Sequence, residues 1–324
     1  MAKCHSCLKE TSGSFCPACQ KKLFGGKKVD HTLPFTRPEF NEMRLAHSNK
    51  LSISGVQVKY SLTLRDKKLK LTEKGGDYII KPVPYGPFKH MESIPANEHL
   101  TMQIAGQVFN INTPPNAVLF FASGEPAYIV KRFDVLVDGT KILQEDFAQV
   151  ADKTEENAGK NYKYDFSYEE IAELMKKYIG AYPVEVEKFF SLVVFNYLVC
   201  NGDAHLKNFS VFRNEQFNDY TLTPAYDLMN TNLHVPSEED TALDLFKNGF
   251  MTESYKAGSK YTREDFLVLG QRFGIRDQRI NSIINKFTNS QENIAEFVEK
   301  SFLEDKLKAD YITFVNGRQE RLSA

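Results

Sequence analysis

The sequence predicts an α+β fold in which a small β-rich part is followed by a larger helical part, with a four-cysteine module in front of both. Three observations predict this order. Four of the five cysteines lie between Cys4 and Cys19. Apolar side chains then alternate with polar ones, as they do in strands, and longer apolar segments suited to helices follow from residue 144 onwards. We therefore expect three units, at residues 1–30, 31–134 and 135–324.

Length and composition are those of an ordinary globular protein. The 324 residues can hold two lobes, and 42% of them are hydrophobic and 26% charged. A formal net charge of −1 gives no general attraction to nucleic acid or to an anionic membrane. No apolar run reaches the length of a membrane span, and the first residues contain no apolar signal-peptide core. We therefore expect a cytoplasmic protein that binds neither membranes nor nucleic acid directly.

Two C-x-x-C pairs make up most of the N-terminal module. Cys4 and Cys7 form the first pair, Cys16 and Cys19 form the second, and eight residues separate them. Four such thiolates can hold a tetrahedral Zn²⁺, and a module of about thirty residues needs a staple because it cannot build a core of its own. We expect a structural zinc knuckle, with redox-active pairs or metal-free thiols as alternatives. The basic, glycine-containing segment 21–28 is predicted to be a linker.

An Asp and an Asn at a spacing used in phosphoryl transfer follow a strongly apolar segment. Residues 186–200 predict a buried helix, and Asp203 and Asn208 come directly after it. Kinases use such an Asp to accept or orient the proton of the nucleophile, and such an Asn to hold Mg²⁺. A later Asp bridges the metal to the phosphates. Asp227 suits that role because it stands between two large apolar residues, where an unpaired carboxylate would be costly.

The same loop contributes two further candidate catalytic residues. His205 can order the loop by hydrogen bonding, although it follows Asp203, whereas the corresponding His of protein kinases precedes the Asp. Lys207 can meet the γ-phosphate, a substrate or only solvent. With these residues, the loop predicts an ATP- and Mg²⁺-dependent kinase.

The β-rich part supplies the other groups that a kinase needs. Alternating apolar residues predict a meander over 51–64, 67–71 and 77–82 and a hairpin over 118–134, with a helix over 96–105 between them. A kinase holds the α and β phosphates of ATP with a strand Lys that pairs with a helix Glu, and the hairpin ends where a hinge would contact adenine. We therefore assign ATP binding to four residues in this part: Lys81, Glu98, Lys131 and Phe133.

The loop expected to face the phosphates contains little glycine. The sequence has no Walker A motif and no G-x-G-x-x-G, which disfavours a P-loop NTPase or a dinucleotide enzyme. In their place a single Gly55 follows Ser54. The candidates for ATP contact in this loop are Ser54, Gly55 and Gln57.

Two other functions compete with the protein-kinase hypothesis. A small-molecule or lipid kinase can use a similar Asp-to-Asn spacing. A non-catalytic module that docks through its cysteine knuckle would carry the motif residues without turning over ATP. The non-catalytic module is disfavoured because five kinase residues occur in the expected order: Lys81, Glu98, Asp203, Asn208 and Asp227.

Seven segments together resemble the HipA-type toxin serine/threonine kinases. They are residues 52–59, 80–82, 96–99, 131–134, 144–147, 201–208 and 225–227. The likeness extends from about residue 45 to the C-terminus. It implies a bilobal, protein-kinase-like fold that uses ATP and Mg²⁺.

The resemblance also implies a biological role and partners. Family members are toxins of toxin–antitoxin systems that phosphorylate aminoacyl-tRNA synthetases and so arrest translation. They autophosphorylate on a serine in the loop that matches residues 52–55, which makes Ser52 and Ser54 the candidates here. The Ser-Ile-Ser form is similar to the short HipT-type branch, in which a separate small protein supplies the missing N-terminal subdomain. The implied partners are a protein substrate, such a small protein and an antitoxin, including a DNA-binding one.

Overall fold

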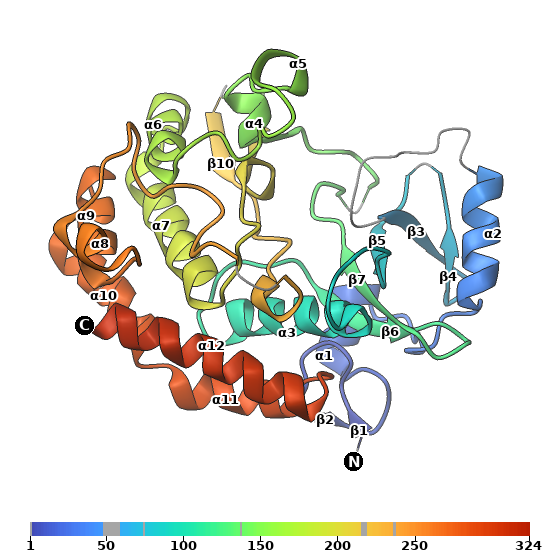
Figure 1. Cartoon of the computed structure of the whole chain (residues 1–324). Helices are drawn as coiled ribbons and strands as arrows, with labels where there is room; N and C mark the ends of the chain where they lie inside the picture. Colours follow the sequence, from blue (N-terminus) through green and yellow to red (C-terminus); the bar gives the residue numbers. More distant parts are fainter. Residues whose placement is uncertain (1, 48–58, 74, 137, 215–218, 236–237) are drawn as a thin grey trace.

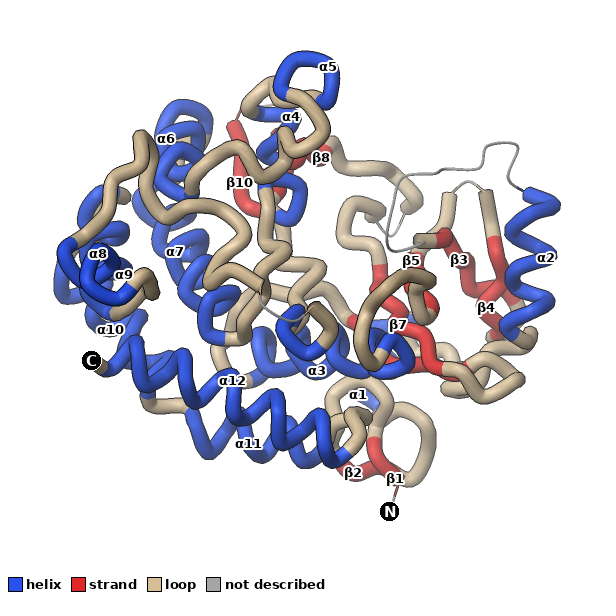
Figure 2. Tube along the Cα trace, in the orientation of Figure 1, coloured by secondary structure: helices blue, strands red, loops and turns tan. Residues whose placement is uncertain are grey.

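Strands dominate one side of the molecule and helices the other, as Figure 1 and Figure 2 show. The computed structural model describes residues 2–47, 59–73, 75–136, 138–214, 219–235 and 238–324. Helices and strands are mixed, as the sequence predicts. No helix in the described ranges has the length and apolar character needed to cross a membrane.

A five-stranded antiparallel sheet forms the β-rich part, in the order β4-β3-β5-β7-β6. Its strands are β3 (Tyr60–Arg65), β4 (Lys68–Leu71), β5 (Tyr78–Pro82), β6 (Asn116–Phe120) and β7 (Pro126–Lys131). The predicted strands and the hairpin are confirmed from residue 60 onwards, but the predicted meander is wrong: β3 pairs with both β4 and β5, so β4 lies at the edge of the sheet and not between its neighbours in sequence. Because side chains alternate along a strand, each strand sends one set of residues to each face of the sheet.

One face of the sheet packs against α3 (Ile94–Gln107), which follows the short 3-10 turn η1 (Met91–Ser93). The predicted helix over 96–105 is confirmed, with Pro95 in its first turn, where the missing N–H is tolerated. Every residue from Ile94 to Ala105 is buried, since the sheet lies on one side of the helix and α11 on another. Polar side chains on α3 therefore need partners inside the protein.

The cysteine module covers the opposite face of the sheet. It consists of β1 (Ala2–Lys3), β2 (Glu10–Thr11) and α1 (Pro17–Phe24), and α2 (Arg37–His47) follows. One apolar cluster joins residues of this module to residues of the sheet: Cys4, Phe15, Cys19, Leu23, Phe24, Tyr78, Ile80 and Ile129.

The prediction of a linker over 21–28 is wrong for its first half. Residues 21–24 are the last turn of α1, and Leu23 and Phe24 are buried in the apolar cluster. The helix places Cys19 and Leu23 four residues apart on one face, which turns Lys21 and Lys22 to the outside. The basic residues gave the segment its linker-like composition.

The second part begins with a strand, whereas the sequence predicts helices from residue 144 onwards. Gln144–Asp146 form β8, which pairs with β9 (Ser210–Asn214), and β10 (Asp219–Leu222) completes a three-stranded sheet. The helix starts only after this strand. Asp146 caps α4 (Phe147–Val150), and the one-turn helix α5 (Glu155–Ala158) follows.

Helices build the rest of this part around α7 (Tyr182–Leu198), which is nearly all buried and confirms the predicted central helix. Ser167 caps α6 (Tyr168–Tyr178) through a reciprocal bond with Glu170. The remaining elements are η2 (Leu206–Asn208), η3 (Thr231–Leu233), α8 (Glu253–Gly258), α9 (Arg263–Arg272), α10 (Asp277–Thr288), α11 (Gln291–Lys300) and α12 (Asp305–Ser323). The apolar core of this part extends to the face of the sheet that carries Tyr128 and Val130.

Candidate active site

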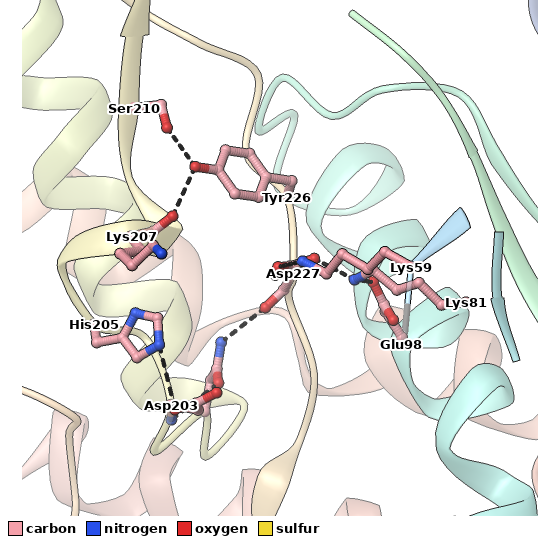
Figure 3. Close-up of polar contacts among 10 residues, drawn as sticks. Lys59, Lys81, Glu98, Asp203, His205, Lys207, Ser210, Tyr226 and Asp227 are labelled. Carbon is pink, nitrogen blue, oxygen red and sulfur yellow. Dashed lines mark hydrogen bonds and ion pairs between the residues drawn. The ribbon is translucent and has the colours of Figure 1, made fainter. Parts of the chain in front are cut away.

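Three charged side chains from distant parts of the sequence meet between the sheet and the helical part (Figure 3). Lys81, on β5, forms ion pairs with Glu98 of α3 and with Asp227, which lies in the segment after β10. The side chains of Lys81 and Glu98 are only 4% and 3% exposed, so solvent screens this pair little. The predicted pairing of strand Lys and helix Glu is present in the structure.

A fourth charge completes this cluster. Lys59, just before β3, places its Nζ atom 2.8 Å from Oδ2 of Asp227, while Lys81 contacts Oδ1. Each carboxylate oxygen of Asp227 therefore faces an ammonium group. Two ammonium groups and two carboxylates give the cluster no net charge, which suits its burial because an unpaired charge would be costly there.

The pKa shifts follow from this balance. Burial alone would lower the pKa of Lys81, but the carboxylates of Asp227 and Glu98 raise it above its ordinary value. Burial raises the pKa of Glu98, and Lys81 offsets this only in part. Burial opposes ionisation of Asp227 as well, yet Lys81 and Lys59 hold its pKa well below the usual range. Glu98 is thus the member whose charge depends most on Lys81.

The backbone at Asp227 is in the left-handed region, with φ of 56°. This conformation is uncommon outside glycine, although Asp tolerates it better than most residues. The preceding residue, Tyr226, is held on the other side of the turn. The hydroxyl of Tyr226 donates to the carbonyl oxygen of Lys207 at 2.9 Å and also contacts the hydroxyl of Ser210. The turn therefore sends consecutive side chains in different directions, Tyr226 towards η2 and Asp227 towards Lys81.

The Asp203 loop follows directly from the buried end of α7. Asn201 is 3% exposed and joins the loop to its surroundings. Its Oδ1 accepts the N–H of Asp203 at 3.3 Å, and its Nδ2 donates to Oδ1 of Asn196 at 2.8 Å and more weakly to the carbonyl of Asp227 at 3.5 Å. The side chain of Asp203 itself is 51% exposed, so it faces solvent and any incoming group.

His205 lies next to Asp203 in the loop. Its Nε2 atom is 3.7 Å from Oδ1 of Asp203, and its Nδ1 atom is buried without a hydrogen-bond partner among the described residues. Burial lowers the pKa of His205 to about 4, even though the Asp203 carboxylate acts in the opposite direction. The imidazole is therefore neutral at neutral pH.

Asn208 ends η2 with a buried acceptor that lacks a partner. Its backbone N–H donates to the carbonyl of His205 at 2.9 Å, but no described group donates to its Oδ1 atom. Buried polar atoms are seldom left without a partner, and amide and carboxylate oxygens are the ligands that Mg²⁺ uses. Asn208 and Asp227 therefore fit a magnesium site by the chemistry of their oxygen atoms.

The other predicted residues do not all lie at the site. The ring of Phe133 lies 5.7 Å from that of Tyr226, so the end of the hairpin does reach the Asp227 turn. Lys131 lies on the face of β7 opposite Tyr128, and its Nζ atom donates to the carbonyl of Lys22 in α1 at 3.4 Å. The side chain of Lys131 thus does not join the Lys81 cluster. Lys207 is exposed on the outer side of η2. Four predicted residues, Ser52, Ser54, Gly55 and Gln57, lie outside the described ranges.

The sequence did not single out two residues that contact the site. Lys59 belongs to a segment that resembles the family, but nothing in its neighbours marks it as a partner of Asp227. Tyr164 is the second, since its hydroxyl donates to Oδ1 of Asp203 at 2.5 Å. No local motif surrounds Tyr164, because it meets Asp203 across 39 residues of chain.

The four N-terminal cysteines form a separate cluster. The sulfur atoms of Cys4, Cys7, Cys16 and Cys19 all lie within 4.8 Å of one another, and none of them is in a disulfide. Hydrogen bonds from Cys19 and Cys7 hold the pKa of the Cys4 thiol well below its ordinary value. Four converging sulfur atoms in this arrangement fit a tetrahedral zinc site.

At the junction of sheet and helices, a buried lysine pairs with a glutamate. Both face an acidic turn and the loop that carries Asp203 and Asn208. This arrangement is that of a kinase-like fold. The chain belongs to the family of HipA-like C-terminal domains, whose profile matches residues 51–294.

Relatives agree with this family. A Haemophilus influenzae protein that bears a provisional kinase name is 26% identical over 300 residues, which cover 87% of this chain and 84% of that protein. The Sinorhizobium fredii protein Y4dM, also provisionally named a kinase, is 31% identical over 212 residues, or 60% of this chain. The chain spans about half the length of Y4dM, at 48%.

Two solved structures share the fold. A chain of the Shewanella oneidensis toxin–antitoxin complex of HipA, HipB and operator DNA superposes with a TM-score of 0.65 and 21% identity, over 90% of this chain and 73% of that one. The Helicobacter pylori proinflammatory kinase CtkA superposes with a TM-score of 0.52 and 14% identity, over 81% of this chain and 90% of that one. Together with the kinase names of the relatives, the fold supports a kinase-like function.

Proposed function

We propose that this chain is an ATP-dependent protein kinase that transfers the γ-phosphoryl group of ATP to serine or threonine side chains. The observation that carries the proposal is the buried ion pair of Lys81 and Glu98 in contact with Asp227. A structural salt bridge between Lys81 and Glu98 would need no second acidic residue. Kinases need both the strand lysine and the metal-binding Asp at the phosphates, and this requirement explains the cluster.

Each residue of the site has a role in this proposal. Glu98 orients Lys81 towards the α and β phosphates, and Asp227 and Asn208 hold magnesium. Bound magnesium would neutralise negative charge on the phosphate oxygens. Asp203 accepts or orients the proton of the attacking hydroxyl, and its exposure supports this role. Neutral His205 stabilises the loop, and Lys207 meets the γ-phosphate or the protein substrate.

The charge balance of the cluster supports nucleotide binding. In the structure, Lys81 and Lys59 occupy both oxygens of Asp227. The phosphates of ATP attract both ammonium groups, so their arrival would release the carboxylate for magnesium. Lys59 is suited to such a change because its side chain is 47% exposed and lies at the surface.

The proposal assigns a part to each segment of the chain. Residues 31–134 form the nucleotide-binding lobe and residues 135–324 the helical lobe of a bilobal kinase, with Phe133 and the backbone near Lys131 at the hinge. Residues 1–30 hold a structural zinc ion through the four cysteines. The apolar cluster shared by this module and the sheet supports a stabilising role for that zinc.

We extend the proposal to a toxin of a toxin–antitoxin system in the cytoplasm. Its protein substrate is an aminoacyl-tRNA synthetase, whose phosphorylation stops translation. A structure of the Shewanella HipA complex contains HipB and operator DNA, and by analogy a DNA-binding antitoxin is proposed as a partner here, together with a separate small protein that resembles an N-terminal kinase subdomain.

Autophosphorylation at Ser52 or Ser54 is proposed as the regulation. A phosphoserine adds about −1.5 to −2 charges at neutral pH. In a loop that faces ATP, this charge would repel the nucleotide and lower its affinity.

The test uses purified chain, magnesium, labelled ATP and a lysate of the host bacterium. Asp203→Asn should reduce phosphoryl transfer by about 10²–10⁴-fold, as expected for loss of a general base. Asp165→Asn is the matched control, because Asp165 is a 71%-exposed carboxylate that pairs with Lys153 at 2.8 Å. Full transfer by Asp203→Asn would remove Asp203 from its role. Label in metabolites or lipids but in no protein would favour the small-molecule or lipid kinase instead.

A further inference from the structure

We propose that Tyr164 is a phosphorylation site of this chain, which receives the γ-phosphoryl group of ATP from its own active site. The inference rests on the proposed kinase function and adds an acceptor to it. Tyr164 lies in the segment between α5 and α6, and its hydroxyl is the group that contacts the proposed catalytic Asp203.

The contact has the geometry that proton transfer needs. The O–H of Tyr164 donates to Oδ1 of Asp203 at 2.5 Å. A general base must lie within hydrogen-bond reach, up to about 3.2 Å, of the atom whose proton it takes, or reach it through one water. The Tyr164 hydroxyl therefore occupies the position, next to Asp203, that an incoming serine or threonine hydroxyl would need.

Backbone and ring contacts hold Tyr164 in this position. The residue before it, Lys163, accepts the backbone N–H of Leu206 at 3.1 Å, and Leu206 belongs to the Asp203 loop. The ring of Tyr164 packs edge-on against His205, with centroids 5.1 Å apart. Burial and the hydrogen bond to Asp203 both raise the pKa of Tyr164, so the phenol keeps its proton until it reacts.

A neighbouring tyrosine illustrates what a purely structural hydroxyl looks like. Tyr168 is 1% exposed, and its hydroxyl donates to the backbone carbonyl of Ala204 at 2.9 Å. Tyr164 differs in both respects, since it is 38% exposed and donates to a carboxylate that is itself half exposed. An exposed hydrogen bond of this kind adds little stability, because water can replace either partner.

The reaction balances with ATP as the only co-substrate. The phenolic oxygen of Tyr164 forms a bond to the γ-phosphorus, and the bond from that phosphorus to the bridging oxygen of ADP breaks, with its electron pair remaining on ADP. Asp203 takes the phenolic proton and later releases it to solvent. The products are ADP and a phosphotyrosine, whose dianion is repelled by the Asp203 carboxylate. The segment should then leave Asp203 and open the site to a protein substrate.

The experiment follows autophosphorylation of the full chain with ATP and magnesium, using site mapping by mass spectrometry. We expect phosphate on Tyr164, at a rate that stays constant when the protein is diluted 100-fold, because the acceptor already lies in its own site. Tyr178 is the matched control: it is equally exposed, at 39%, but packs against Tyr220. It should remain unmodified. Asp203→Asn should abolish the Tyr164 signal.

Four outcomes would overturn the inference. ADP release and serine phosphorylation without phosphate on Tyr164 would refute it and leave the proposed function standing. Equal labelling of Tyr164 and Tyr178, or a rate proportional to protein concentration, would attribute the label to exposure or to a second molecule. Neither ADP release nor any phosphorylated residue in the folded wild type would remove the kinase proposal, and this inference with it.

Discussion

Replacing Lys81 by methionine tests the central cluster most directly. The change keeps the length of the side chain but removes the ammonium group. Asp227 retains Lys59 at 2.8 Å, whereas Glu98, only 3% exposed, loses the ammonium group of Lys81, with which it is paired. We therefore expect the cost to arise at Glu98.

Two independent estimates of this cost agree. Removing one partner of a buried ion pair costs about 3–5 kcal/mol. Alternatively, Glu98 can take up a proton. Protonation at pH 7 of a group whose unfolded pKa is about 4.3 costs about 4 kcal/mol, at 1.36 kcal/mol per pH unit. Lys81→Met should thus lower the free energy of unfolding by about 3–4 kcal/mol at pH 7.

The pH dependence has a definite sign. Without Lys81, burial keeps the pKa of Glu98 raised in the folded state. The folded chain then binds a proton that the unfolded chain has released, so the deficit of Lys81→Met grows as pH rises above about 4.3. It should shrink towards zero as pH falls to that value. The double variant Lys81→Met with Glu98→Gln should lose this pH dependence.

The assay is denaturant unfolding followed by circular dichroism at pH 5, 6, 7 and 8. Lys59→Met is the matched control, because its half-exposed ion pair should contribute less than about 1 kcal/mol. Equal losses in Lys59→Met and Lys81→Met, or a deficit that does not change with pH, would refute the reasoning.

Two further predictions concern the other sites. Elemental analysis should find one zinc per chain; Cys19→Ser should lower both zinc content and the free energy of unfolding, whereas Cys200→Ser, outside the cluster, should keep the zinc. A stable wild type without zinc would contradict this. His205 has a pKa of about 4 when folded, below its unfolded value, so the unfolded chain binds the extra proton as pH falls from about 6.5 to 4. The free energy of unfolding of the wild type should therefore fall across that window, and that of His205→Gln should fall by up to roughly 3 kcal/mol less. Parallel curves of stability against pH for the two proteins would contradict this prediction.

Local patterns in the sequence predicted the elements that surround the site. Alternating apolar residues located the strands from residue 60 to 131, and the predicted helices over 96–105 and 186–200 are α3 and α7. They failed where pairing at a distance overrides local preference. Residues 144–146 form a strand only because β9 lies beside them, and residues 21–24 are helical because the sheet buries Leu23 and Phe24.

Family resemblance and spacing together selected Lys81, Glu98, Asn208 and Asp227 before the fold was known. The side chain of Lys131 shows the limit of such reasoning. Its place at the end of a strand suited a nucleotide contact, but the alternation along β7 turns it towards α1 instead. Counting from Tyr128, which lies on the Lys81 face, would have predicted this.

The sequence by itself determined which chemical groups this protein possesses and in which order they occur: four thiols at zinc spacing, a strand lysine, a helix glutamate, and the acids and amide of the loop. Such signals are local, because they depend on periodicity and on short intervals along the chain. Only the tertiary structure decided that Lys59 neutralises Asp227 across 168 residues and that Tyr164 donates to Asp203. Contacts of this kind depend on how whole elements pack, and no interval along the sequence encodes them.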